Sequence, residues 1–478
     1  MDTLNYEVLA KSGYNGYILK NAPEKVLQFG EGNFLRAFVD YWFDLANEKA
    51  DWNGKCVLVQ PIAPGLAKMI NEQEGLYTLY LRGSENGRKV DDKRVISSVS
   101  RCLNPYEEEG FKQMMDVAAS DDLEIIVSNT TEAGIVYDPA CKLEDVPASS
   151  FPGKLTQVLY HRYKAGKKGI IMLACELIDN NGKELLKCVN QYIDQWGLDD
   201  GFRTYVNEDC TFCGSLVDRI VPAATPETLQ EIADQLGVYD PCAIACEPFR
   251  QWVIEDNFVN GRPDWDKVGA QFVADVVPFE MMKLRMLNGS HSFLAYLGYL
   301  GGYETIADTM TNPAYRKAAF SLMMQEQAPT LSMPEGTDLN AYATLLIERF
   351  SNPSLRHRTW QIAMDGSQKL PQRLLDPVRL HLQNGGSWRH LALGVAGWMR
   401  YTQGVDEQGN AIDVVDPMLA EFQKINAQYQ GADRVKALLG LSGIFADDLP
   451  QNADFVGAVT AAYQQLCERG ARECVAAL

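Results

Sequence analysis

The chain has 478 residues, of which 46% are hydrophobic and 22% charged, and its formal net charge is −19. This length is enough for two domains with full cores, and the acidic balance argues against nucleic acid as the main partner. No apolar run is long enough to span a membrane, and the first residues do not have the pattern of an export leader. We therefore expect a cytoplasmic protein.

Eleven cysteines are scattered along the chain, an odd number that is typical of reduced thiols. The pairs Cys210-x2-Cys213 and Cys242-x3-Cys246 could be combined into a zinc site, but no histidine lies near them in the sequence. The five histidines form no His-x3-His or His-Glu-x2-His pattern. We therefore expect neither a structural nor a catalytic metal.

A nucleotide-binding turn is indicated near the start of the chain. Residues 25–29 are typical of a short apolar strand, and the turn Gly-Glu-Gly and an apolar helix follow directly. The first glycine, Gly30, permits a tight turn, and the second, Gly32, lets a pyrophosphate approach the N–H groups of the helix. The third glycine of the usual fingerprint is absent, so the pattern alone leaves an ordinary turn as the alternative. Residues 1–22, before the strand, are expected to have little structure.

Further strands are expected at 56–60, 76–81, 95–99, 123–128 and 169–175, with a hairpin turn at 83–87 between the second and third of these. Small and polar residues follow the last two strands, at 129–134 and at 176–182. Such strand ends are where doubly wound sheets bind ligands, although plain connecting loops would have the same composition.

One stretch in the second half carries three polar residues at helical spacing. At about 100° per residue, Asn288 lies about 140° and His291 about 80° from Lys283, so the three share one face of an α-helix. Gly289 is unusual in a helix interior, and the close approach of a ligand or of another backbone would explain it. The alternative is an ordinary amphipathic helix whose buried part is supplied by Leu284, Met286 and Leu287.

The spacing Lys-x4-Asn-x2-His resembles the signature of the long-chain mannitol dehydrogenase family, which comprises polyol and hexuronate dehydrogenases. The resemblance covers nearly the whole chain. It implies that Lys283 is the general base, that Asn288 holds the developing oxyanion and that His291 positions both. It also implies an α/β fold with an N-terminal Rossmann-like doubly wound domain at 1–275, a mainly α-helical C-terminal domain at 276–478, and an active site between them.

The glycine turn resembles the family's own variant, Gly-x-Gly-x-Phe-x-Arg, in which Arg36 adds charge near the phosphates. The end of the second strand carries Gln60 instead of an acidic residue, and no cation follows to hold a 2′-phosphate, so the family implies NAD rather than NADP. The implied cofactor-binding residues are Phe29, Gly30, Glu31, Gly32, Asn33, Phe34, Leu35, Arg36 and Thr131.

The resemblance also implies substrate contacts. Asp218 lies in the stretch 217–222, which is near the substrate in the polyol enzymes, and Lys369 ends an Asp-Gly-Ser-Gln-Lys motif and could meet a carboxylate. A solvated helix lysine is the alternative for Lys369. Polyol members have Asp and then an oxyanion-hole Asn after the cysteine at 175, whereas this chain has Glu and Leu there. Whether Asn180 or Asn181 compensates is left open.

The two halves resemble different branches of the family. Residues up to about 213 are most similar to tagaturonate reductases, and those from 217 onward are very similar to fructuronate reductases. A chimera joined near 217–222, or a natural intermediate, would explain this.

The expected reaction is the NAD-dependent interconversion of D-fructuronate and D-mannonate, with D-tagaturonate and D-altronate as the alternative. A nucleotide-binding sensor that has lost its chemistry is the alternative from another class. The substrate is a small sugar acid, and no oligomeric state follows.

Overall fold

The computed structural model describes residues 1–131 and 133–478, so Glu132, within the expected ligand-binding loop at 129–134, lies outside the described residues. The chain forms two compact units, Met1–Val277 and Pro278–Leu478. They divide two residues after the boundary expected from the sequence.

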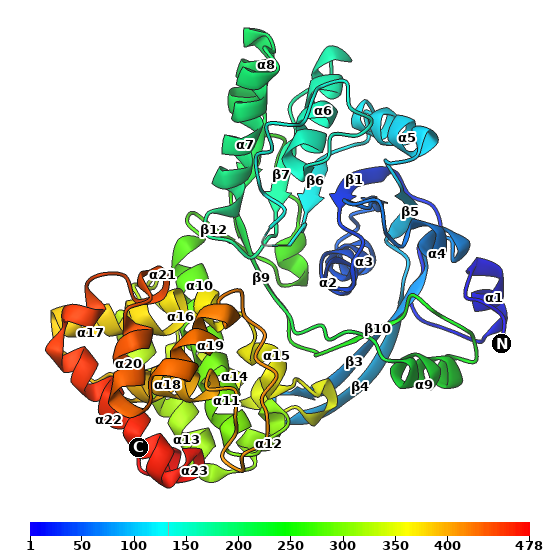
Figure 1. The fold of residues 1–478 in the computed structure, drawn as a ribbon. Helices are drawn as coiled ribbons and strands as arrows, with labels where there is room; N and C mark the ends of the chain where they lie inside the picture. Colours follow the sequence, from blue (N-terminus) through cyan, green and yellow to red (C-terminus); the bar gives the residue numbers. More distant parts are fainter. Residues whose placement is uncertain (132) are drawn as a thin grey trace. The chain divides into compact units, whose positions relative to one another are not determined.

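The first unit is built on a parallel sheet with the strand order β5-β2-β1-β6-β7-β8. Figure 1 labels β5, β1, β6 and β7 of this sheet. Counted along the chain within this sheet, the order is that of the dinucleotide-binding fold. The prediction of a Rossmann-like doubly wound domain is therefore confirmed. The strands are β1 (Glu24–Phe29), β2 (Lys55–Val59), β5 (Val99–Leu103), β6 (Ile125–Ser128), β7 (Ile171–Ala174) and β8 (Thr211–Cys213).

Successive side chains of each strand point to opposite faces of the sheet, and each face has its own core. Val26 and Leu58 belong to the cluster that includes Trp42 of α3, whereas Leu27 and Val57 belong to the cluster formed with α5, α6 and α7. The helices of this unit are α2 (Asn33–Ala37), α3 (Val39–Lys49), α4 (Ala67–Glu72), α5 (Glu108–Ala118), α6 (Phe151–Lys164), α7 (Asn181–Gln195), α8 (Asp200–Thr204) and α9 (Pro226–Leu236), with a π-helix η1 (Tyr205–Asp209) and a 3-10 helix η2 (Trp265–Val268).

A long hairpin is inserted between β2 and β5, and it differs from the expected one. Strand β3 (Tyr77–Glu85) continues past the end expected at Arg82 and pairs antiparallel with β4 (Arg88–Ile96). The turn is the dipeptide Asn86-Gly87, and both residues have positive φ, as a tight hairpin turn requires. Val99, expected in the returning strand, instead begins β5 of the parallel sheet. The remaining strands are β9 (Ser215–Asp218), β10 (Ile244–Cys246), β11 (Gln251–Glu255) and β12 (Gln271–Val273).

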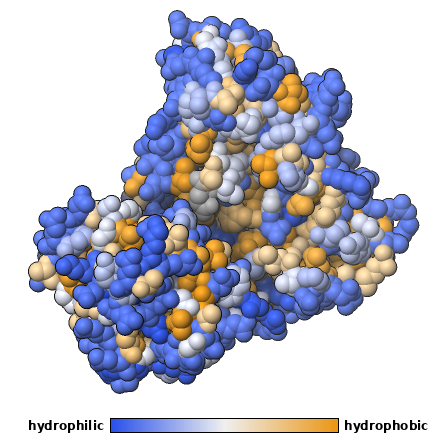
Figure 2. Space-filling model, in the orientation of Figure 1, coloured by the Kyte–Doolittle hydropathy of each residue, from blue (hydrophilic) through white to orange (hydrophobic). Residues whose placement is uncertain are grey.

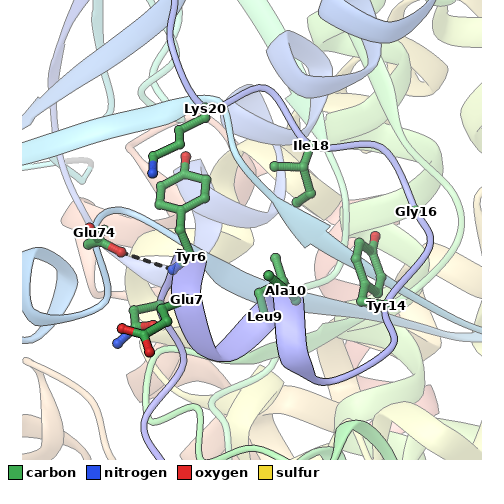
Figure 3. A pocket seen from close by; sticks show the side chains of 10 residues that line it. Tyr6, Glu7, Leu9, Ala10, Tyr14, Gly16, Ile18, Lys20 and Glu74 are labelled. Atoms are coloured by element: carbon green, nitrogen blue, oxygen red, sulfur yellow. Dashed lines mark hydrogen bonds between the residues drawn. The ribbon is translucent and has the colours of Figure 1, made fainter.

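The expectation of little structure at 1–22 is wrong in part, because helix α1 (Tyr6–Lys11) forms there with Asn5 as its cap. The N–H of Tyr6 donates to Glu74 Oε2 at 2.9 Å, at the rim of a pocket of about 720 Å³ (Figure 3). None of the expected site residues lines this pocket, which is formed by Asn5, Tyr6, Glu7, Leu9, Ala10, Tyr14, Gly16, Ile18, Lys20 and Glu74.

The second unit is helical, as predicted. Helix α11 (Ser290–Leu300) is buried along almost its whole length and packs against α15 and α18. Its neighbours in the chain are α10 (Val277–Met282) and the π-helix η3 (Lys283–Gly289). The other α-helices are α12 (Ile306–Met310), α13 (Pro313–Ser321), α14 (Leu339–Phe350), α15 (Thr359–Ala363), α16 (Gly366–Leu370), α17 (Asp376–Asn384), α18 (Arg389–Tyr401), α19 (Leu419–Gln428), α20 (Gly431–Leu439), α21 (Ser442–Phe445), α22 (Ala453–Arg469) and α23 (Ala471–Ala476). Two further π-helices, η4 (Leu322–Gln327) and η7 (Pro371–Leu375), pack against η3, and the 3-10 helices are η5 (Ala328–Thr330), η6 (Pro353–Leu355) and η8 (Leu449–Gln451).

Hydrophilic residues cover most of the visible outer surface of each unit (Figure 2). Within the described ranges, no helix is long and apolar enough to cross a membrane. The eleven cysteines are all free thiols, and all but Cys467 are buried. Among the described residues, no group of three or more His, Cys, Asp or Glu side chains is arranged to hold a metal ion.

Candidate active site

The two glycines of the turn after β1 are required for different reasons. Gly30 has a φ of 125°, and a Cβ there would lie 2.7 Å from the backbone oxygen of Asn129, so the fold itself needs this glycine. Gly32 has an ordinary φ of −65°, and a Cβ there would meet nothing within 4 Å. No contact within the described chain accounts for a glycine at position 32, and the space beside it is open to a ligand.

The turn is held from beneath by Gln28, whose Nε2 donates to the carbonyl oxygen of Gly30 at 3.1 Å. Arg36 is 2% exposed, and its guanidinium donates to the carbonyl oxygens of Glu31 and Cys242. The side chain expected to add charge near the phosphates therefore lies under the turn and fixes its backbone. Of the other expected cofactor residues, Phe29, Glu31 and Leu35 are buried, Asn33 and Phe34 are half-buried, and Thr131 is exposed.

The carboxyl ends of β6 and β7 are joined by Glu176, a residue for which the sequence suggested no role. Its carboxylate is buried and accepts hydrogen bonds from Ser128 Oγ and from both the N–H and the Oγ1 of Thr130, each at 3.1 Å. Burial raises the pKa of this carboxyl above its usual value. The loop after β6 is thereby fixed, and the next residue, Thr131, has a φ of 69°, which is strained for a β-branched side chain.

The two asparagines after β7 differ in what their amides contact. Asn181 is fully buried, and its Nδ2 donates to the carbonyl oxygens of Glu176 and Ser215 at 3.0 and 2.9 Å. Asn180 is half-buried with a φ of 53°, and its side chain makes no hydrogen bond to any described residue. Asn180 is therefore the one whose amide is available to a ligand, and its contact with a substrate stays a prediction.

The catalytic helix expected around Lys283 is present, but its central part is not α-helical. Residues Lys283–Gly289 form the π-helix η3, between α10 and α11. In a π-helix each N–H bonds the carbonyl five residues earlier, so Asn288 follows Lys283 by one hydrogen-bonded turn. The angle of about 140° expected for an α-helix does not apply. Lys283 and Asn288 are half-buried, and His291 is 6% exposed.

Gly289 is explained by the approach of another backbone, one of the two reasons expected from the sequence. A Cβ there would lie 2.5 Å from Gln327 Nε2 and 3.0 Å from the carbonyl oxygen of Arg373. Gln327 Nε2 itself donates to that carbonyl at 3.1 Å. Three π-helices, η3, η4 and η7, therefore meet at the backbone of Gly289.

His291 lies among aromatic rings and positive charges. Its ring stacks on Phe350 with centroids 4.6 Å apart and meets the ring of His357 edge-on at 5.1 Å. Burial lowers the pKa of His291 well below its usual value, and the nearby His357, Arg373, Arg349 and Lys369 act in the same direction. The imidazole is therefore neutral around pH 7, and its Nε2 has no hydrogen-bond partner within the described chain.

The other expected substrate residues lie in both units. Asp218 ends β9 and is 3% exposed, opposite Gln251 of β11. Lys369 is half-buried in α16, and its Nζ donates to the carbonyl oxygen of Ile362 at 3.1 Å. Lys369 is therefore only partly solvated, and its contact with a carboxylate stays a prediction.

Two residues of this neighbourhood were missed by the sequence reasoning. The Nη1 of Arg373 donates to Ser292 Oγ at 3.2 Å and lies 3.5 Å from the carbonyl oxygen of Asn288, so it braces the helix that carries the three polar residues. His357 contacts His291 directly. Arg373 and His357 lie within 20 residues of Lys369 in the sequence, but no periodic pattern there could have pointed to them.

The chain matches two family models that together cover most of its length. Residues 24–267 match the mannitol dehydrogenase Rossmann domain, and residues 275–467 match the mannitol dehydrogenase C-terminal domain. In fold, the chain is similar to Pseudomonas fluorescens mannitol 2-dehydrogenase, solved as a ternary complex with NAD and D-mannitol. The TM-score is 0.82 and the identity 28%, over 99% of this chain and 98% of the other.

Two curated relatives represent the two branches. The chain is 65% identical to D-mannonate oxidoreductase of Escherichia coli (strain K12) over 95% of each chain, an alignment that includes both halves of the sequence. It is 36% identical to altronate oxidoreductase of Phocaeicola vulgatus over 99% of each chain. The chain is thus an oxidoreductase that belongs to the mannitol dehydrogenase family.

Proposed function

We propose that this protein catalyses the NAD-dependent interconversion of D-fructuronate and D-mannonate. The observation that carries the proposal is the arrangement of Lys283, Asn288 and His291 on one helix, with positive side chains around the imidazole. The 65% identical relative named D-mannonate oxidoreductase supports the choice of substrate. The polar triplet would serve no purpose in a nucleotide-binding sensor without chemistry, which makes that alternative the weaker one.

The glycine turn fits a dinucleotide, because position 32 is open on the side where a side chain would otherwise stand. The end of β2 supports NAD over NADP. Gln60 is 2% exposed, and its amide donates within its own loop, to the carbonyl oxygens of Ile62 and Ala63. The proposed cofactor residues are Phe29, Gly30, Glu31, Gly32, Asn33, Phe34, Leu35 and Thr131, and Arg36 would contribute by holding the backbone of the turn from beneath. The bound nicotinamide would supply or accept the hydride.

The residues of the helical unit would handle the proton and the charge. In reduction, Lys283 gives a proton to the keto oxygen as that oxygen gains negative charge, and in oxidation it takes the hydroxyl proton back. The amide of Asn288 donates to the same oxygen and stabilises its charge. The neutral His291 orients both groups. Lys369 supplies a cation for the carboxylate of the sugar acid, and Asn180 and Asp218 are the proposed contacts to its hydroxyl groups.

The Gly32→Val variant should bind NADH at least about tenfold more weakly and remain folded. A side chain at this position meets no protein atom, so it interferes only with a ligand that approaches the backbone. NADH fluorescence titration measures the binding, and thermal unfolding measures the fold. The matched control is Gly30→Ala, which should unfold at a lower temperature because its backbone is left-handed and its Cβ meets Asn129. Unchanged NADH affinity in Gly32→Val would contradict the proposed cofactor site.

The kcat/KM for D-fructuronate should exceed that for D-tagaturonate. The reason is that Lys283, Asn288, His291 and Lys369 all lie in the half of the chain that is similar to fructuronate reductases. NADH oxidation assayed with each keto acid measures the ratio. A roughly tenfold preference for D-tagaturonate, about 1.4 kcal/mol of transition-state binding, would instead support the runner-up, an altronate oxidoreductase. Turnover of neither keto acid would leave the inactive nucleotide-binding sensor.

A further inference from the structure

His357 is held in place by its backbone. It lies between η6 and α15, and its carbonyl oxygen accepts the N–H of Ile306 at 2.9 Å. The next residue, Arg358, forms an isolated antiparallel bridge with Thr305. The preceding residue, Arg356, has a φ of 44°, a conformation that costs energy in a residue with a side chain. Such strained positions are found at ligand sites more often than elsewhere.

The imidazole of His357 has a nitrogen that the protein does not satisfy. Its Nδ1 is buried and has no hydrogen-bond partner among the described residues, and the same is true of Nε2 of the adjoining His291. The other two histidines of this unit differ, because His381 Nε2 bonds the carbonyl oxygen of Glu326 and His390 Nδ1 bonds its carboxylate. Buried polar atoms normally have partners. Two unsatisfied nitrogens on touching rings therefore indicate a polar ligand at this point.

The charges around His357 indicate the chemistry of that ligand. Burial lowers the pKa of His357 to about 4, and Lys369 acts in the same direction. The ring is therefore neutral around pH 7 and can donate one N–H while Lys369 brings a full positive charge. Arg349 and Arg373 add positive charge on the His291 side. A neutral N–H donor beside a lysine suits an acceptor that carries negative charge, which a carboxylate is.

We propose that His357 binds the carboxylate of the sugar acid together with Lys369, and so makes the site selective for hexuronates over the uncharged ketoses of the same shape. This inference rests on the proposed function, because it needs a substrate that carries both a keto group and a carboxylate. It assigns to His357 a contact with the substrate and no part in the proton transfer, which stays with Lys283.

The test replaces the ring nitrogens and compares two substrates. D-Fructose has the carbon chain of D-fructuronate with a hydroxymethyl group in place of the carboxylate. His357→Phe keeps a ring but removes the donor, and the kcat/KM for D-fructuronate should fall about 10- to 100-fold, mainly through KM. The kcat/KM for D-fructose should change less than threefold. His357→Asn, which restores an N–H donor near the position of Nδ1, should recover most of the activity on D-fructuronate.

Two controls separate the outcomes. Arg358→Gln removes the exposed ion pair with Glu304 from the same segment, and it should leave the ratio of the two kcat/KM values unchanged. Binding of D-mannonate and of D-mannitol to the complex with NADH, measured by NADH fluorescence, gives a second reading that does not depend on turnover, and His357→Phe should weaken the binding of D-mannonate only. An equal loss with both sugars, or no loss with either, would overturn the assignment of His357 while the parent enzyme still reduces D-fructuronate. A parent enzyme that neither reduces D-fructuronate nor binds D-mannonate would overturn the proposed function as well.

Discussion

Lys283→Met should lower kcat for reduction and for oxidation by roughly 10²–10⁴-fold, the contribution of a positioned acid and base, and it should leave NADH affinity nearly unchanged. Lys283 is half-buried on the π-helix η3, and methionine has a similar length without the proton. Steady-state rates in both directions and NADH titration measure the effect. Lys283→Ala removes both the amine and the volume of the side chain. A similar loss of rate in the two variants would show that the amine, and not the volume, is what matters. Near-normal turnover in either variant would contradict the assignment.

The pH dependence of the parent enzyme follows from the same role. Lys283 must be uncharged to accept the hydroxyl proton in oxidation and charged to donate it in reduction. The rate of oxidation should therefore rise with pH, and the rate of reduction should fall, over the pH range in which Lys283 loses its proton. His357, with its pKa lowered to about 4, and His291, with its pKa also well below the usual value, are already neutral there and add no ionisation. The same slope in both directions would rule out a shared acid and base.

The fold could be predicted where one local signal decided the structure. The apolar run at 25–29 and the glycines after it predicted β1 and its turn, because a buried parallel strand and a tight turn each need a particular composition. The hairpin was placed less well. The expected turn at 83–87 includes Gly83, which lies inside β3, whereas the chain reverses at Asn86-Gly87. The strand β5 of the parallel sheet was missed, because its first residue, Val99, was assigned to the returning strand and residues 100–103 were assigned to no strand.

The candidate site could be predicted in its residue types but not in its geometry. The α-helical angle assumed for Lys283 and Asn288 was wrong, because these residues lie in a π-helix, which has no distinct sequence pattern and here packs against η4 and η7. Arg36 looks in the sequence like a phosphate ligand, yet its guanidinium donates to the carbonyl oxygens of Glu31 and Cys242 and to Asn33 Oδ1. His357 contacts His291 only because the tertiary fold brings the two residues together. The periodicity of residues along one helix gives no information about such a contact.

Asn288→Ala should lower kcat by roughly 10²–10³-fold, the usual effect of removing one donor from an oxyanion site. In the π-helix this residue follows Lys283 by one hydrogen-bonded turn, and we therefore expect its amide and the lysine amine to act on one oxygen of the substrate. Because the amide acts on charge that develops in the transition state, KM should change much less than kcat. Steady-state kinetics on D-fructuronate with saturating NADH measures both constants.

The matched variant Asn288→Asp keeps the size of the side chain but replaces its donor with a carboxylate. If the amide stabilises negative charge, this variant should be slower than Asn288→Ala around pH 7, since a like charge near the forming oxyanion raises its energy. Protonation of the carboxyl would restore a donor, so its rate of reduction should recover relative to Asn288→Ala as the pH falls. An aspartate variant as active as the parent at pH 7 would show that the amide donates nothing to the reacting oxygen, and Lys283 alone would then have to stabilise the charge.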